Sequence, residues 1–337
     1  MFLEPLSQYE EILKDAIRTS MKVSGAKLAK TFQTLLIEIL TLYMILPRKI
    51  NFTQMARYGK HGEHTYRQKF NRKKKDCIDW LLLNLSLARR VLEMDGLLAI
   101  AIDPCYISKA GKKTPHIGRF WSGCAGAVKH GLEIMGIGLL DVANNKCMML
   151  RAHQTIGNSA LKMRNKTLVE YYISVMKRYS KKLLSITDIV VADAFFSTST
   201  FEKGMSELGF YLVSRFRDNA CLRYIPKKGK RRGRPRVKGD RIDLANLNLS
   251  CMEEVHIDGL DGKAYTLEAY AKALKKRVRL VIWRMPGGNC KLFFSTKLSM
   301  KGEEVLKTYR TRFQIEFCYR DSKQFTGLMD CQTRHKR

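Results

Sequence analysis

The sequence predicts a mixed α/β protein in which a helical N-terminal region precedes a sheet flanked by helices. Residues 1–90 have helical patterning, and from Asp95 apolar strand-like runs alternate with helical segments. Residues 217–299 are rich in strand-like runs. The length of 337 residues is that of two or three domains with enough chain to bury a core.

The charge balance indicates a polyanionic partner. The chain has 62 Lys and Arg against 31 Asp and Glu, a net charge of +31, while its 45% hydrophobic content is ordinary for a globular protein. A pI near 9.9 favours nucleic acid over an anionic membrane surface.

Two classes of extracytoplasmic protein are not expected. The N-terminus has no basic segment followed by an apolar one, so we predict no signal peptide. The longest apolar run, Leu35 to Leu46, is interrupted by Glu38 and is too short to span a bilayer. The nine scattered cysteines form no C-x-x-C pair, which argues against disulfides and structural zinc and fits a reducing cytosol.

The first region, residues 1–92, contains a candidate helix-turn-helix. Residues 51–59 resemble its first helix, and residues 64–71 could form the second. Eight basic residues and a single acid lie between Arg57 and Lys75. We interpret this run, which includes Lys73 and Lys74, as a DNA-contacting face, and a solvated charged helix is the alternative.

From Asp95 the pattern becomes that of a sheet, and we assign residues 93–216 to the first part of a catalytic domain. Residues 97–103 and 186–193 are apolar runs that end in an acid, as in strands buried on both faces. The full order is β-β-β-α-β-α-β. The remaining predicted elements are strands at 132–142, 147–153 and 210–216 and helices at 159–181 and 197–208.

A β-rich insertion is predicted at residues 217–299, with strands at 265–271, 278–285 and 291–295. Residues 300–337 follow it and begin with a long helix at 301–323.

Two of the buried strands end in carboxylates, Asp103 and Asp193. Adjacent parallel strands place their carboxyl ends side by side, so these aspartates could share a divalent cation that offsets their repulsion. Strand-terminal aspartates also simply begin turns, and Asp141 and Asp188 lie at strand ends as well.

A stripe of polar side chains follows on the predicted helix at 301–323. At about 100° per residue, Tyr309, Arg312, Glu316 and Lys323 fall within about 60° of one another. We interpret Glu316 as a third metal ligand, with Arg312 and Lys323 reaching flanking phosphates and Tyr309 against the DNA backbone. An exposed salt-bridge face is the alternative.

The spacing Tyr-x2-Arg-x3-Glu-x6-Lys resembles the signature of bacterial insertion-sequence transposases with a DDE catalytic domain. The stretches DPCYISKAGKK from Asp103, FWSGCAG from Phe120 and VADAFF from Val191 are also similar to that family. The similarity covers about residues 97–330 and, more weakly, the N-terminal helices.

The resemblance implies an RNase H-like fold whose catalytic, metal-binding residues are Asp103, Asp193 and Glu316. It implies two Mg²⁺ ions, with Mn²⁺ as a substitute, that promote hydrolysis of a phosphodiester at a transposon end and strand transfer to target DNA. The implied partners are terminal inverted repeats, target DNA and a second copy in a synaptic homodimer, with no membrane. A bacterial, cytoplasmic and nucleoid-associated location follows.

A basic segment and a tryptophan are further candidates for contact with DNA. Arg232-Gly-Arg234-Pro, within the basic run at 227–238, looks like an AT-hook core that enters a narrow minor groove, and a disordered charged loop is the alternative. Trp283 in the insertion is a candidate for stacking on a displaced base, and a core tryptophan is the alternative.

The main rival is a catalytically inactive or truncated transposase relative that only binds DNA. Only 21 residues follow Glu316, whereas relatives usually continue with further helices, so we expect a C-terminal truncation. A structural RNA-associated protein would explain the charge but not the aligned stripe.

Overall fold

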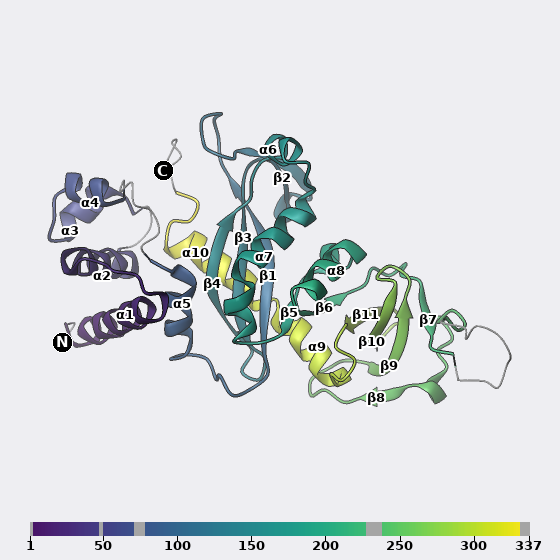
Figure 1. Cartoon of the computed structure of the whole chain (residues 1–337). Coiled ribbons are helices and arrows are strands. Elements are labelled where there is room, and N and C mark those ends of the chain that lie inside the picture. Colours follow the sequence, from purple (N-terminus) through teal and green to yellow (C-terminus); the bar gives the residue numbers. More distant parts are fainter. Residues whose placement is uncertain (1–2, 47–49, 71–77, 227–237, 331–337) are drawn as a thin grey trace.

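A computed structural model describes residues 3–46, 50–70, 78–226 and 238–330. Helices at the N-terminus lie at one end of the molecule, a twisted sheet lies in the middle, and the strands of residues 217–299 lie at the other end (Figure 1). The sequence-predicted DNA contacts Lys73, Lys74, Arg232 and Arg234 lie outside the described residues.

Five helices form the N-terminal region. The two short ones, α3 and α4, coincide with the predicted helix-turn-helix pair, and the Asn51 side chain caps α3 by accepting from the Gln54 N–H at 2.8 Å. Glu38 secures the turn between them, because its carboxylate accepts from the Tyr66 hydroxyl and the Lys60 N–H. The helices are α1 (Leu3–Ser24), α2 (Lys30–Ile45), α3 (Phe52–Tyr58), α4 (Glu63–Phe70) and α5 (Trp80–Ala88).

A mixed sheet flanked by helices follows, as the sequence predicts. Its first strand pairs antiparallel with β3 and parallel with β5, and β5 in turn pairs parallel with β6. This arrangement is consistent with an RNase H-like fold. The strands are β1 (Leu98–Ser108), β2 (Gly118–Ser122), β3 (Ala127–Asp141), β4 (Lys146–Gln154), β5 (Ile189–Val191) and β6 (Tyr211–Arg215).

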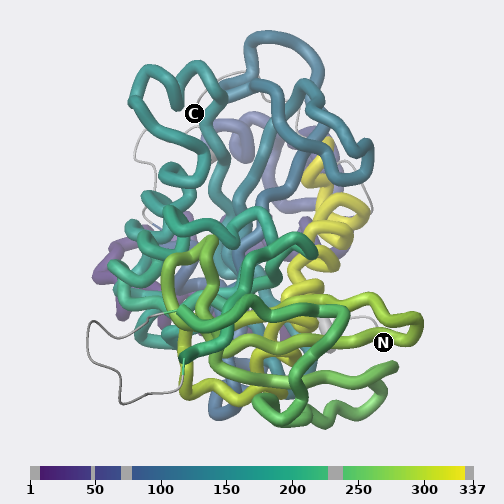
Figure 2. The backbone as a smooth tube through the Cα atoms, turned by 90° about the vertical axis from the view of Figure 1, so that its right-hand side faces the viewer, coloured from purple at the N-terminus to yellow at the C-terminus, as the bar shows by residue number. Residues whose placement is uncertain are grey.

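The helices cover both faces of this sheet. Even-numbered residues of β1, such as Ile100 and Ile102, pack with α5, α6 (Asn158–Met163), α7 (Leu168–Leu184) and α8 (Ser199–Glu207). Odd-numbered residues such as Ala99 and Ala101 pack with α9 (Gly302–Thr311) and α10 (Gln314–Phe325). Figure 2 shows α9 and α10, in yellow, running along one side of the molecule.

The prediction of one continuous helix over 159–181 was wrong. The chain leaves α6 after Met163 and starts α7 with a capping box, in which Thr167 and Glu170 satisfy each other's backbone N–H groups. The local capping interaction therefore outweighs continuation of the helix.

The predicted β-rich stretch contains strands, and they extend the same sheet. Strand β11 pairs antiparallel with β6, so that β11, β10, β9 and β7 continue the order beyond the strands already described. The elements are β7 (Leu222–Tyr224), β8 (Glu253–Val255), β9 (Lys263–Ala271), β10 (Lys276–Arg284) and β11 (Cys290–Ser295). Three short 3-10 turns complete the described elements, at Gly123–Ala125, Ala194–Phe196 and Leu249–Cys251.

Two glycines on β3 allow α10 to lie directly on the sheet. A Cβ at Gly136 would come within 2.9 Å of the Tyr319 ring, and one at Gly138 would lie 3.3 Å from Ile315. Tyr319 and Ile315 are both buried. Small residues at these positions therefore determine how closely α10 approaches β1, since Gly136 is the strand partner of Asp103.

We predict that Gly136→Ala lowers the free energy of unfolding by about 1–3 kcal/mol, because the added methyl group displaces the buried Tyr319 ring. Urea denaturation followed by circular dichroism measures the change. Gly123→Ala is the matched control, since a Cβ there meets no atom within 4 Å. Equal unfolding midpoints for the two variants would contradict the packing argument.

Candidate active site

The register of two parallel strands brings Asp103 and Asp193 to the same edge. Ala101 of β1 pairs with Val191 of β5, and each aspartate lies two residues further along its own chain. Because alternate residues of a strand face the same side, both aspartates lie on the face that α9 and α10 cover. The expectation that the two aspartates lie on adjacent strands is met, but the prediction that the first strand ends at Asp103 was wrong. Strand β1 continues to Ser108 because its pairing with β3 extends to Gly131.

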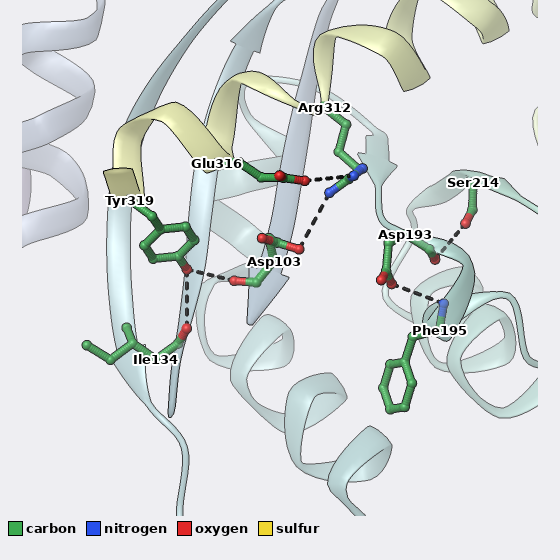
Figure 3. Close-up of polar contacts among 8 residues, drawn as sticks. All are labelled: Asp103, Ile134, Asp193, Phe195, Ser214, Arg312, Glu316 and Tyr319. Atoms are coloured by element: carbon green, nitrogen blue, oxygen red, sulfur yellow. Dashed lines mark hydrogen bonds and ion pairs between the residues drawn. The ribbon is translucent and has the colours of Figure 1, made fainter. Parts of the chain in front are cut away.

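The turn after β5 fixes Asp193. Its side chain accepts from the Phe195 N–H at 3.1 Å, as the cap of the 3-10 turn at 194–196, and its carbonyl accepts from the Ser214 hydroxyl at 2.8 Å (Figure 3). A neighbouring strand, β6, thus holds the main chain of Asp193 in place.

Arg312 connects Asp103 with Glu316. Its guanidinium lies 3.5 Å from Asp103 Oδ1 and donates to Glu316 Oε1 at 3.1 Å (Figure 3). The Arg312 side chain is only 11% exposed, against 16% for Asp103 and 41% for Glu316. A largely buried ion pair therefore joins the middle of β1 to the helix that carries the glutamate.

The helix predicted at 301–323 is broken at this point, so the prediction of one continuous helix was wrong. The N–H groups of Phe313, Ile315 and Glu316 bond to carbonyls three residues earlier, which tightens the chain between α9 and α10. Arg312 lies in the break, with its side chain directed at Asp103.

The other two members of the predicted stripe contact protein groups. The Tyr309 ring packs on Phe293 with 5.0 Å between centroids, and the Arg312 guanidinium lies 5.6 Å from the Tyr309 ring centroid. Lys323 donates to the Tyr106 carbonyl of β1 at 3.2 Å. Lys323 therefore joins α10 to β1, and Tyr309 joins α9 to β11.

Tyr319 was missed by the sequence reasoning. Its hydroxyl donates to the Asp103 carbonyl at 2.7 Å and lies 3.2 Å from the Ile134 carbonyl (Figure 3). The only sequence signal was its position three residues after Glu316, which places both side chains on neighbouring parts of one helix surface.

Burial dominates the electrostatics of the two aspartates. It raises the pKa of Asp103 to about 7, with Arg312 opposing this shift and Asp193 and Glu316 reinforcing it. Burial also raises the pKa of Asp193, against the effects of Arg312 and the backbone N–H groups of the following turn. The charge of Asp193 thus makes Asp103 harder to ionise.

The donor set fits a hard divalent cation. Asp103, Asp193 and Glu316 offer carboxylate oxygens, the ligands that hard divalent cations prefer. Arg312 interacts electrostatically with all three carboxylates, and Arg215 interacts with Asp193. In the described parts of the chain, however, no three His, Cys, Asp or Glu side chains are already close enough to hold a metal ion, since Arg312 lies between Asp103 and Glu316.

The two alternative aspartates, Asp141 and Asp188, make structural contacts. Asp141 accepts from the backbone N–H groups of Glu93 and Asn144, at 3.0 Å each. Asp188 pairs with Lys297 at 2.8 Å. Trp283 stacks on Phe293 and donates its indole N–H to the Asp261 carbonyl at 2.7 Å.

Asp103 within β1, Asp193 after β5 and Glu316 on α10 offer carboxylate oxygens of the kind that can hold divalent cations. Residues 26–271 match the family described as DDE superfamily endonucleases, and the chain therefore belongs to that family. The resemblance derived from the sequence is confirmed at this level. No curated protein matches the sequence. None of the helices in the described ranges is long and apolar enough to cross a membrane.

The raised pKa of Asp103 predicts how stability depends on pH in the metal-free protein. Because the folded form holds this proton up to about pH 7 and the unfolded form loses it near pH 4, stability falls as pH rises between these values. In EDTA, the free energy of unfolding should fall between pH 5 and pH 8 by about 2 kcal/mol more in the wild type than in Asp103→Asn. Identical pH profiles from urea titrations would contradict this shift.

Proposed function

We propose that the protein is a DNA transposase that cleaves phosphodiesters at the ends of an insertion sequence and transfers the freed strand to target DNA. Membership of the DDE endonuclease family supports a nuclease acting on DNA. The single observation that carries the proposal is the position of Asp103, Asp193 and Glu316 around Arg312 on one face of the sheet.

In this proposal Asp103, Asp193 and Glu316 hold two Mg²⁺ ions, or Mn²⁺ in their place. The ions supply activation of a water or 3′-hydroxyl and stabilisation of the leaving oxygen. Tyr319 and Ser214 fix the main-chain carbonyls of the two aspartates, so that both carboxylates keep their orientation. Arg312 neutralises Asp103 and Glu316 before DNA binds and then lies within reach of a phosphate.

The remaining parts of the chain contribute DNA contacts in this proposal. The region 1–92 binds the terminal inverted repeat through α3 and α4, and residues 93–216 with 300–337 form an RNase H-like catalytic domain that the insertion at 217–299 interrupts. Lys323 binds a phosphate next to Glu316, and Tyr309 packs against the DNA backbone there. Two copies pair the transposon ends in a synaptic homodimer in the bacterial cytoplasm, at the nucleoid.

A second candidate is a catalytically inactive relative that binds DNA. The ion pairs from Arg312 to Asp103 and Glu316 favour it, because they satisfy both carboxylates without a metal. A cleavage assay on supercoiled plasmid bearing candidate inverted repeats, with and without Mg²⁺, separates the two functions.

We predict that Asp103→Asn, Asp193→Asn and Glu316→Gln each reduce nicking of this plasmid to the background without enzyme. Each change removes a metal-binding charge while preserving shape, so binding of the same DNA in a mobility-shift assay should persist. The matched controls are Asp188→Asn at the opposite end of β5 and Asp321→Asn on the exposed face of α10, which should cleave at the wild-type rate. A triad variant that still nicks the plasmid removes that residue from the site.

A further inference from the structure

A two-stranded ribbon extends β2 and β3 beyond the end of β1. The last residue of β1, Ser108, pairs with Gly131, and the earlier part of β3, from Ala127, pairs with β2. Residues 123–130 at the tip are all exposed. The blue loops at this end lie opposite the green strands of the insertion (Figure 2).

One face of this ribbon carries an exposed aromatic side chain. Side chains of directly paired residues share a face, so Trp121 lies beside Val128, and Arg119 and His130 follow on the same face. Trp121 is 60% exposed and Val128 is 49% exposed. A tryptophan left this open on a strand is typical of an interaction surface.

The loop between β1 and β2 adds two cations to this face. The His130 ring lies 2.9 Å from the Gly111 carbonyl, which holds the loop against the ribbon next to Lys112 and Lys113. Both lysines are exposed, and neither they nor Arg119 forms an ion pair with any carboxylate in the described ranges. We call Lys112, Lys113, Arg119, Trp121, Val128 and His130 the ribbon surface.

The surrounding chain carries no negative charge to offset these cations. Residues 104–132 contain five Lys and Arg and no Asp or Glu, although the chain averages one acid in about eleven residues. A second acid-free stretch, residues 142–169, meets the first where Gln154 donates to the Pro115 carbonyl at 2.9 Å. This end of the sheet therefore attracts a polyanion.

The distance along β3 from the partner of Asp103 to the partner of Trp121 corresponds to about eight base pairs of duplex. Gly136, the partner of Asp103, and Val128, the partner of Trp121, are eight residues apart on β3. At about 3.4 Å per residue this is about 27 Å, close to eight base pairs at about 3.4 Å each.

We propose that the ribbon surface binds the backbone and groove edge of duplex DNA about eight base pairs from the phosphodiester held at Asp103. The inference rests on the proposed function, because it takes the cleaved DNA to lie at that aspartate. Lys112 and Arg119 contact phosphates, and Trp121 packs against sugar and groove atoms. A second copy of this chain is disfavoured as the occupant, since two such cationic surfaces repel each other.

The salt dependence of DNA binding tests the phosphate contacts. In the full chain carrying Asp103→Asn to prevent cleavage, fluorescence anisotropy gives the Kd of a labelled 30-base-pair duplex over a series of KCl concentrations. We expect Lys112→Ala/Arg119→Ala to reduce the slope of log Kd against log salt by about 2. The matched control is Lys177→Ala/Lys181→Ala, two exposed lysines of α7, which should leave the slope unchanged.

The fluorescence of Trp121 tests contact directly. The chain has three tryptophans, so Trp80→Phe/Trp283→Phe leaves Trp121 as the sole emitter. We expect saturating duplex to reduce acrylamide quenching of Trp121 several-fold, and a single strand of equal length to protect it less.

An unchanged salt slope together with unchanged quenching overturns the proposal. Stronger protection of Trp121 by the single strand overturns the assignment to duplex. If Lys112→Ala/Arg119→Ala changes the sedimenting mass of the protein but leaves its DNA binding unaltered, the surface binds a second copy of the chain instead. None of these measurements requires cleavage, so they separate failure of the ribbon surface from failure of the nuclease assignment.

Discussion

The structure depends on holding acidic side chains together on one face of a largely buried sheet. Burial penalises each ionised carboxylate, and their mutual repulsion adds to that penalty. Arg312 meets this demand because it is itself nearly enclosed and contacts both Asp103 and Glu316. Arg312 lies at the break between α9 and α10. There the chain replaces i→i−4 hydrogen bonds with bonds to carbonyls three residues earlier, up to Glu316.

The backbone around the acidic cluster is fixed by contacts from several elements. Register between β1 and β5 sets the separation of the aspartates, while hydroxyl groups of Tyr319 and Ser214 secure their carbonyls. Gly136 lets α10 approach closely enough for the Tyr319 bond to form. Orientation at the cluster is thus built from main-chain hydrogen bonds and close packing as well as from charge pairing.

Much of this arrangement could be predicted from local sequence patterns. Apolar runs that end at Asp103 and Asp193 identify two buried strands that lie side by side. The full length of β1 was not predicted, because its part from Pro104 to Ser108 is less apolar and less buried. The role of Tyr319 was not predictable, because it depends on a contact between residues 216 positions apart. The breaks after Met163 and at Arg312 were also missed, since capping and a buried ion pair outweigh helical periodicity there.

The pairing of β6 with β11 makes the inserted strands part of one continuous hydrogen-bonded sheet. A domain joined through a flexible linker could turn independently of its neighbour, but a shared ladder resists such rotation because its bonds would have to break together. Strand β6 also supplies Ser214, which binds the Asp193 carbonyl. A force that displaces the far strands consequently acts, through β11 and β6, on the main chain of Asp193.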